Sequence, residues 1–247
     1  MSPSAAVKNF PATRRRNTRF LAVALAASIT TCGAAAEPVR IICIGDSITQ
    51  GGRTGREEFT YRWPLFVMLK KSGINFDFIG SRQEGLDRDV KWPVAYKGAS
   101  FDADHEGYYG AKTATVRDKL RAVLPGLPVP DIALIHLGTN DQHAKNHTAA
   151  VVKPLKDIIK QLRAKNPKVV ILVGHLNFND GEALKIRPLV EKMATGMNTQ
   201  QSPVVTVHHY KGWNEKPEAK TTDTFDWAHP NPKGQRKMAK AWFDAMK

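Results

Sequence analysis

Short apolar segments alternate with amphipathic segments along most of this chain, and this alternation narrows the folds that it can adopt. Near-continuous apolar runs predict buried strands at residues 41–44, 75–80, 131–137, 169–174 and 203–208. Apolar residues at helical spacing predict helices at 61–71, 113–123, 148–165, 182–199 and 231–247, with the start of the third left open by Pro154. Strands that alternate with helices form parallel sheets. The sequence therefore predicts an α/β fold with a doubly wound parallel sheet of about five strands.

The first 36 residues differ in composition from the rest of the chain. A stretch with five basic residues and no acidic one precedes a short apolar run at 20–29 and a small-residue stretch that ends in Ala34-Ala35-Ala36. This order is typical of a secretory signal peptide, which predicts cleavage after Ala36 and export to the periplasm or the exterior. An uncleaved anchor is the alternative, but the apolar run is short for a membrane span. We expect residues 37–247 to form a single domain with no membrane span.

The chain carries a formal net charge of +14, and removal of its first 36 residues would leave +9. A positive exported protein can be attracted to an anionic polysaccharide or surface. The sequence contains no recognised nucleic-acid motif, so a nucleic acid is not an expected partner. Cleavage would also remove Cys32 and leave Cys43 alone, which excludes a disulfide within the mature chain. Cys43 lies inside an apolar run, where a free cysteine acts as a small buried hydrophobe rather than as a catalytic thiol.

Gly45-Asp46-Ser47 follows the first apolar run directly. Open α/β sheets build their sites just beyond the carboxyl ends of the strands, so this position makes Ser47 a candidate nucleophile. The same tripeptide is also an ordinary turn and a helix N-cap signal, and alone it favours that interpretation over a catalytic site. Asp46 is expected to hold the turn. A nucleophilic serine would need a base, an acid that orients the base, and donors for an oxyanion.

The segment at 226–230 can supply the base and the acid. Asp226 lies three residues before His229, so its carboxylate can fold back onto Nδ1 of the imidazole and leave Nε2 free for a serine. Pro230 restricts the backbone of His229 and would hold it on a defined loop. The alternative is that Asp226 caps a turn and His229 is a surface residue, and the spacing alone does not decide between them.

Two further segments can supply oxyanion donors. Asn140 follows the apolar run at 131–137, and its side-chain amide can donate a hydrogen bond to a developing oxyanion. Gly110 can bring a backbone N–H to the same point because no side chain blocks the approach. Asparagine and glycine are also common turn residues, which is the alternative for both. Asp141 is expected to be a structural acceptor.

Taken together, these segments resemble the sequence blocks of the SGNH (GDSL-type) hydrolase family, in the family's order. The first block matches Gly45-Asp46-Ser47-Ile48, the second Gly110, the third Gly138-Thr139-Asn140-Asp141, and the last Asp226-x-x-His229. The resemblance implies a three-layer α/β/α fold that is flavodoxin-like. It also implies a catalytic triad of Ser47, Asp226 and His229. The oxyanion hole that it implies is formed by Ser47, Gly110 and Asn140.

Within this family, the chain is similar to carbohydrate esterase family three, which includes acetylxylan esterases. The similar segments lie at 45–49, 61–62, 76–81 and 104–107. The similarity implies a serine esterase that removes acetyl or other short acyl groups from a carbohydrate and needs no metal or organic cofactor. Two alternatives stay open. One is a lysophospholipase, thioesterase or other lipid esterase, and the other is a non-catalytic carbohydrate-binding protein with a vestigial triad.

The aromatic residues near these segments are candidates for stacking on a sugar ring, with core packing as the alternative. They are Tyr61, Tyr108, Tyr109 and Trp227. The adjacent residues His208 and His209 suggest metal ligands at first sight. Neighbouring side chains on a strand point to opposite faces, however, so this pair is not expected to bind one metal ion.

Overall fold

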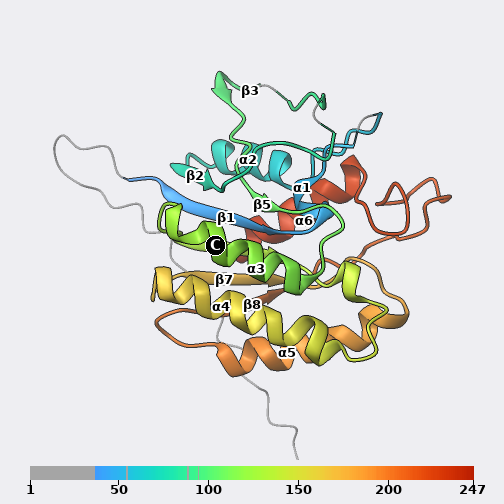
Figure 1. Ribbon diagram of the computed structural model, residues 1–247. Helices are drawn as coiled ribbons and strands as arrows, with labels where there is room; N and C mark the ends of the chain where they lie inside the picture. Colours follow the sequence, from blue (N-terminus) through green and yellow to red (C-terminus); the bar gives the residue numbers. More distant parts are fainter. Residues whose placement is uncertain (1–36, 54, 88, 94) are drawn as a thin grey trace, which may run out of the picture.

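Five parallel strands in the order β2-β1-β6-β7-β8 form the central sheet of this computed structural model (Figure 1). They span Val39–Gly45 (β1), Phe76–Ile79 (β2), Ile132–His136 (β6), Val170–Gly174 (β7) and Val204–Val207 (β8). A short sixth strand, β5 (Glu106–Gly107), pairs in parallel with the end of β1. The structure describes residues 37–53, 55–87, 89–93 and 95–247, and the predicted signal peptide lies outside them. The prediction of a parallel sheet of about five strands is confirmed.

Helices cover both faces of the sheet and complete three layers (Figure 1). One face packs against α3 (Thr113–Val123), α4 (Lys153–Lys165) and α5 (Gly181–Met197), and the other against α2 (Arg62–Lys71) and α6 (Pro232–Ala245). Shorter elements are α1 (Ser47–Gln50), the helical turns η1 (Leu124–Gly126), η2 (Thr139–Asp141) and η3 (Thr148–Val152), and the antiparallel pair β3 (Ala95–Tyr96) and β4 (Ala99–Ser100). Within the described residues, no helix combines the length and the apolar character needed to cross a membrane.

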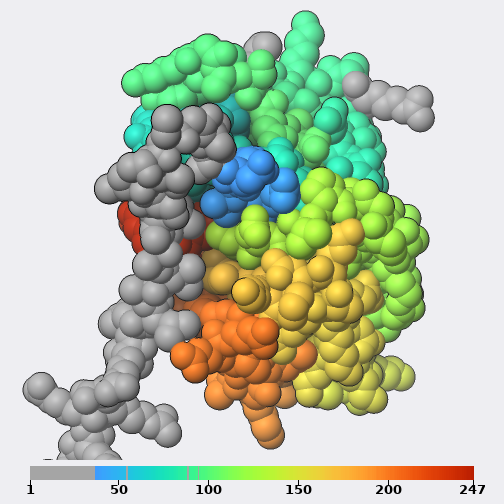
Figure 2. All heavy atoms as spheres, turned by 90° about the vertical axis from the view of Figure 1, so that its left-hand side faces the viewer, coloured from blue at the N-terminus to red at the C-terminus, as the bar shows by residue number. Residues whose placement is uncertain are grey.

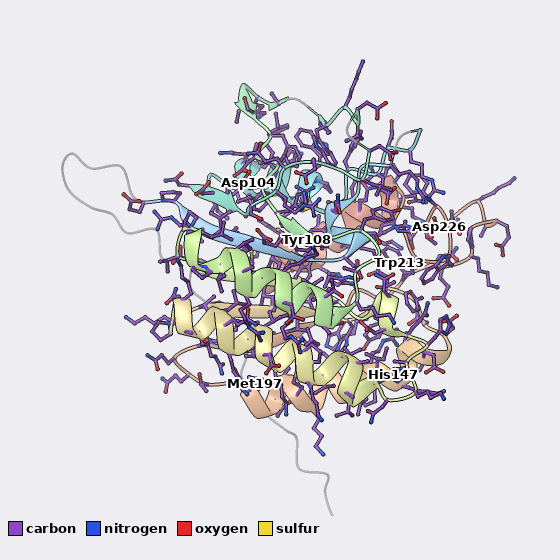
Figure 3. All side chains as sticks on the ribbon, viewed as in Figure 1. Asp104, Tyr108, His147, Met197, Trp213 and Asp226 are labelled. Atoms are coloured by element: carbon purple, nitrogen blue, oxygen red, sulfur yellow. The ribbon has the colours of Figure 1, made fainter. Side chains whose placement is uncertain are left out.

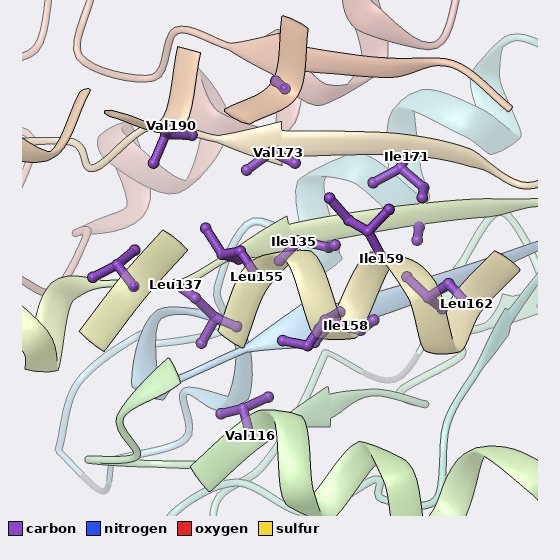
Figure 4. Packing of buried hydrophobic residues seen from close by; sticks show 14 of the residues in the cluster. Val116, Ile135, Leu137, Leu155, Ile158, Ile159, Leu162, Ile171, Val173 and Val190 are labelled. Atoms are coloured by element: carbon purple, nitrogen blue, oxygen red, sulfur yellow. The ribbon is translucent and has the colours of Figure 1, made fainter. Parts of the chain in front are cut away.

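An apolar stripe on α4 fixes this helix against the sheet. Its side chains recur every three or four residues, which places them on one side of the helix, and they are buried against β6 and β7 (Figure 4). They are Leu155, Ile158, Ile159 and Leu162. Because burying an aliphatic side chain of this size contributes about 1.5–3 kcal/mol, the stripe is a major term in docking the helix layer.

The structure fixes the start of the third predicted helix, α4, which Pro154 left open in the sequence. Residues 148–152 form a π-helical turn, and the α-helix starts at Lys153 with Pro154 in its first turn. Proline lacks the N–H that would bond to the carbonyl of Ala150, and its ring crowds that carbonyl, so an α-helix does not run unbroken across it. The helix predicted within residues 148–165 is therefore confirmed, and its start, which the sequence left open, lies at Lys153.

The opposite face of the sheet is closed by α2 and α6. Trp242 of α6 is fully buried, and its ring centroid lies 5.9 Å from that of Tyr61, which directly precedes α2. Near the start of α6, the Gln235 amide donates a hydrogen bond to the carbonyl of Glu57 at 2.8 Å. The first turns of α6 thus hold the loop at 51–60, which borders the carboxyl end of β1.

The strands end together at one edge of the sheet. Gly45, His136 and Gly174 are paired across β1, β6 and β7, and each is the last residue of its strand. The segments that leave this edge contain Ser47 and Asn140, so two of the predicted site residues emerge from neighbouring strands. Figure 2 looks onto the opposite, amino edge, where the start of β1 (blue) reaches the surface between the two helix layers.

Candidate active site

Ser47 is the first residue of α1, directly beyond the turn that ends β1. The side chain of Asp46 caps this helix, because its Oδ1 accepts the N–H of Ile48 at 3.0 Å. Complete burial raises the pKa of Asp46 to about 7, although the Ile48 N–H favours the charged form. A Cβ on Gly45 would lie 2.8 Å from the carbonyl oxygen of His136, so this close approach requires glycine. Asp46 therefore has the structural role that the sequence predicted.

The structure brings Ser47, His229 and Asp226 together, although 182 positions separate the first two. Nε2 of His229 lies 3.0 Å from Oγ of Ser47, and Nδ1 lies 2.9 and 3.0 Å from the two carboxylate oxygens of Asp226. Figure 3 labels Asp226 on a loop at the carboxyl edge of the sheet. A carboxylate beside Nδ1 favours the tautomer with its proton there, which leaves Nε2 to accept the serine proton.

The carboxylate of Asp226 is held by several donors besides the imidazole. Oδ1 accepts the backbone N–H groups of Ala228 at 3.0 Å and His229 at 2.9 Å, and Nη1 of Arg56 donates to Oδ2 at 2.7 Å. Partial burial acts to raise the pKa of Asp226, but Arg56 and the two N–H groups keep it well below its usual range. Asp226 is therefore ionised and can stabilise an imidazolium.

Two charged residues of the loop at 51–60 border this site and were missed in the sequence. Arg56 forms the ion pair with Asp226, and Glu58 is only 2% exposed. Neither carboxylate oxygen of Glu58 has a hydrogen-bond partner among the described residues, and burial raises the pKa of this side chain. Charged residues in a glycine-rich loop after the nucleophile are only a weak signal of a site role. In addition, no spacing in the sequence links Arg56 to Asp226, which lies 170 positions away.

Gly110 lies in a turn at 108–111, which is held by a hydrogen bond from the N–H of Ala111 to the carbonyl of Tyr108 at 3.0 Å. The φ of Gly110 is 70°, a left-handed conformation that glycine adopts without strain. The neighbouring N–H of Tyr109 is bound by Oε1 of Gln50 at 2.7 Å. Because Gln50 is the last residue of α1, this bond anchors the Gly110 turn to the helix that carries the candidate nucleophile.

Asn140 is tied to the same turn. Its Nδ2 donates to the carbonyl of Ala111 at 3.0 Å, one residue beyond Gly110. An amide group has two N–H donors, so one remains for a substrate oxygen. Oδ2 of the adjacent Asp141 accepts both the N–H of Thr113 at 2.8 Å and its hydroxyl at 2.6 Å. Asp141 thus has the predicted structural role, and the structure brings Asn140 beside Gly110.

Tyr61 and Cys43 both belong to the core. Tyr61 is fully buried beside Trp242, and its hydroxyl lies 3.1 Å from Oγ1 of Thr49. A ring with no exposed surface cannot stack on a sugar, so that prediction for Tyr61 is wrong. Burial raises the pKa of the Cys43 thiol to about 12. Cys43 is thus an uncharged core residue, as the sequence predicted.

The other three aromatic candidates lie closer to the surface. Tyr108 is mostly buried and donates its hydroxyl to Glu106 at 2.5 Å, but one part of it lines a surface groove. Tyr109 lines the same groove and stacks on His229. Trp227 is 55% exposed, on the loop between Asp226 and His229. Of the four, Tyr109 and Trp227 offer the most accessible ring surface next to the triad.

The groove has a volume of about 590 Å³ and borders the Gly110 turn. Polar and charged side chains make up most of its lining, which includes Gln50, Arg82, Glu84, Tyr108, Tyr109, Lys112, Thr115 and Lys119. A more apolar cavity, of about 230 Å³, lies at the amino edge of the sheet between Val39, Leu69 and Phe243. It is at the far end of the strands from Ser47 and is not part of this site.

A family model described as the GDSL-like Lipase/Acylhydrolase family matches residues 43–237. The chain belongs to this family. The match begins in β1 before Ser47 and ends in α6, so it includes all the residues of the candidate site. As a GDSL-like acylhydrolase, the chain is a member of a family of carboxylic ester hydrolases.

This GDSL-like acylhydrolase is similar to several known esterases. It is 27% identical to a multidomain esterase of Ruminococcus flavefaciens, over 92% of this chain and 32% of that protein, so it spans about a third of that relative. A structure of a carbohydrate esterase family 3 from Talaromyces cellulolyticus is 24% identical, with a TM-score of 0.65 over 83% of this chain and 94% of the other. A structure of an acetyl esterase mutant with acetate ion is 22% identical, with a TM-score of 0.67 over 84% and 98%. These structures share the three-layer fold described above.

Proposed function

We propose that this acylhydrolase is a serine esterase that removes acetyl or other short acyl groups from a carbohydrate. The observation that carries the proposal is the row of hydrogen bonds from Ser47 through His229 to Asp226, beside the Gly110 turn and Asn140. This arrangement has the nucleophile, base, orienting acid and oxyanion donors that acyl transfer requires.

In the proposed mechanism, Oγ of Ser47 attacks the ester carbonyl while Nε2 of His229 takes its proton. Asp226 stabilises the imidazolium that forms. The N–H groups of Ser47 and Gly110 and the free amide N–H of Asn140 donate to the oxyanion, which lowers the barrier. As the bond between the acyl carbon and the sugar oxygen breaks, His229 gives the proton to that oxygen, and the sugar leaves with a free hydroxyl. Water, activated by the same imidazole, hydrolyses the acyl-enzyme and releases the acid.

The groove beside the Gly110 turn supports a polar substrate. Its lining presents amide, hydroxyl and charged groups that can bind sugar hydroxyls, and more of its surface is polar than apolar. The exposed Trp227 can contact a sugar ring through a flat face, and Tyr109, one face of which stacks on His229, can do so only through the rest of its ring. The names of the similar structures, a carbohydrate esterase and an acetyl esterase with acetate ion, agree with this assignment.

Export and an anionic substrate form the second part of the proposal. The groove carries the basic side chains Arg82, Lys112 and Lys119 against the single acid Glu84, and residues 37–247 have a formal charge of +9. Both features favour attraction to an acidic polysaccharide. Fractionation of expressing cells, with sequencing of the mature amino terminus, tests export. Protein that starts at Met1 and stays in the cytoplasm would overturn it.

Hydrolysis of p-nitrophenyl acetate by the purified protein tests the mechanism. We expect Ser47→Ala to abolish hydrolysis and labelling by a fluorophosphonate, and the exposed Ser72→Ala at the end of α2 to retain both. Full activity in Ser47→Ala would refute the serine mechanism. Absence of hydrolysis and labelling in the folded wild-type protein would instead favour the non-catalytic binding protein.

The substrate class needs a separate pair of measurements. A series of p-nitrophenyl esters should give the highest kcat/KM with acetate and a steady decline as the acyl chain lengthens. Acetate release from acetylated xylan, pectin, chitooligosaccharide and peptidoglycan then identifies the carbohydrate. A maximum at long acyl chains would favour the lysophospholipase or thioesterase alternative.

A further inference from the structure

Three potential metal ligands from different elements meet at the carboxyl edge of the sheet, away from Ser47. His175 directly follows β7, His208 directly follows β8, and Glu191 lies in α5. Their ligand atoms all lie within 4.8 Å of one another, and no other described group of three such residues is as close. β7 and β8 are the second and third neighbours of β1, which puts the cluster roughly 10–14 Å along the sheet from β1.

The carboxylate of Glu191 lies between the two imidazoles. Its Oε1 is 2.6 Å from Nε2 of His175 and 3.7 Å from Nδ1 of His208. The two rings stack with centroids 5.3 Å apart and an angle of 24° between their planes. Zinc holds nitrogen and oxygen ligands at about 2.0–2.2 Å in a tetrahedron, which sets those ligands roughly 3.4 Å apart. The donors therefore need shifts of only about 1 Å to reach one ion.

Two further features prepare these side chains to bind a cation. Nδ1 of His208 is shielded from solvent and has no hydrogen-bond partner among the described residues. The hydroxyl of Thr206 donates to Oε2 of Glu191 at 3.0 Å, which orients the carboxylate and leaves Oε1 facing the imidazoles.

The positive charge of the neighbouring Arg187 limits the affinity for a metal ion, but its guanidinium does not occupy the site. The Arg187 guanidinium donates to the carbonyl of Phe178 and to Oδ1 of Asn179, and it lies 3.6 Å from the centroid of the Tyr210 ring. It is thus held by partners other than Glu191. Its charge still opposes a second cation, so we expect weaker binding than in a four-ligand structural zinc site.

We propose that His175, Glu191 and His208 bind a divalent transition-metal ion, best matched by zinc, and that the ion ties α5 to the ends of β7 and β8. Two imidazoles and one carboxylate suit zinc, with water in the fourth position. The side chains of Glu191 and His208 are 42% and 35% exposed, which leaves a path for the ion and room for water. This site is separate from the triad, and its effect is on stability.

The spacing in the sequence did not point to this site. His208 and His209 do face different surroundings, because His209 is buried with its ring centroid 4.5 Å from that of Trp242. His208 finds its partners instead just after β7 and in α5, which no local pattern reveals.

Metal titration of the chelator-treated, full-length protein tests the proposal. We expect CoCl₂ to give saturable visible absorption bands of a nitrogen- and oxygen-ligated site, and ZnCl₂ to displace the cobalt. Zinc well above its dissociation constant should raise the Tm by about 5 °C. Glu191→Gln and the partly exposed His208→Gln should lose both responses while retaining the wild-type circular dichroism spectrum.

His147→Gln is the matched control. His147, which Figure 3 labels, lies 3.2 Å from Glu182 in another histidine–carboxylate pair, but no third ligand atom of the described residues lies within 4.8 Å of both. This variant should retain the cobalt spectrum and the zinc-dependent rise in Tm. Absence of saturable cobalt binding by the wild type, or an unchanged response in Glu191→Gln, would overturn the proposal.

Discussion

The ring of Tyr109 stacks on the imidazole of His229, with centroids 5.4 Å apart and an angle of 16° between the planes. The backbone N–H of Tyr109 is bound by Gln50 at the end of α1, and Ser47 begins the same helix. One rigid turn of helix therefore positions the candidate nucleophile directly and the candidate base through an aromatic contact. The stack limits rotation of the imidazole away from Ser47, which lies 3.0 Å from Nε2.

Removal of this contact should slow the reaction. We expect Tyr109→Ala to lower kcat for p-nitrophenyl acetate by about threefold to tenfold, because aromatic pairs contribute about 0.5–1.5 kcal/mol beyond their buried area. Tyr109→Phe keeps the ring and removes only a buried hydroxyl that has no hydrogen-bond partner in the described structure, so it should restore most of the loss. Equal kcat values for the alanine variant and the wild type would show that the stack does not position His229.

Removal of the Asn140 amide should lower kcat more than removal of the Tyr109 ring. Loss of one oxyanion donor costs about 2.7–4 kcal/mol of transition-state stabilisation, so Asn140→Ala should lower kcat by roughly 10²–10³. KM should change little, because the oxyanion forms only during the reaction. Asn146→Ala, at an exposed residue before η3, serves as the control with normal kcat. A kcat for Asn140→Ala within twofold of wild type would exclude its amide from the oxyanion hole.

Much of the sheet and of the candidate site could be predicted because β1 and β6 are buried on both faces. Such strands appear in a sequence as continuous apolar runs. Here each run is followed by a glycine and then by polar residues. The pattern itself thus locates Ser47 and Asn140 at strand ends. Asp226 and His229 are recognisable by a different route, since their contact lies within one local turn.

The unpredicted features depend on contacts between distant segments. Arg56 reaches Asp226 across 170 positions, and Tyr61 is directed into the core by Trp242 of α6. The meeting of Glu191 with His208 likewise follows from the docking of α5 beside β8. No local period encodes these pairs, because they arise from the packing of whole helices on the sheet.

The buried Asp46 should make stability depend on pH. Its pKa is about 7 in the folded protein and near 3.8 in the unfolded chain, so the unfolded state releases this proton first as the pH rises. The corresponding stability is present below about pH 4 and is lost by about pH 7, with a magnitude on the order of 4 kcal/mol. Asp46→Asn stays neutral and keeps an oxygen for the Ile48 N–H. In urea unfolding, the free energy of unfolding of Asp46→Asn minus that of the wild type should therefore be larger at pH 8 than at pH 5. An equal difference at the two pH values would contradict this prediction.

Glu58 leads to a stability prediction of the same sign. Burial raises the pKa of its carboxyl group above the ordinary 4.5, and neither oxygen has a hydrogen-bond partner among the described residues. The stability linked to this group is therefore present below about pH 4.5 and is lost as the pH rises through the folded-state pKa. Glu58→Gln replaces a buried charge with a neutral amide, which is less costly to bury.

We therefore expect Glu58→Gln to raise the free energy of unfolding at pH 7 by roughly 1–3 kcal/mol, and to have a smaller effect at pH 4. Glu57→Gln changes the same charge at the exposed neighbouring position and is the matched control. Urea unfolding of the three proteins at both pH values gives the comparison. If Glu58→Gln were less stable than the wild type at pH 7, the ionised carboxylate would have to be stabilised by the adjacent Arg56 and His229 by more than its burial costs.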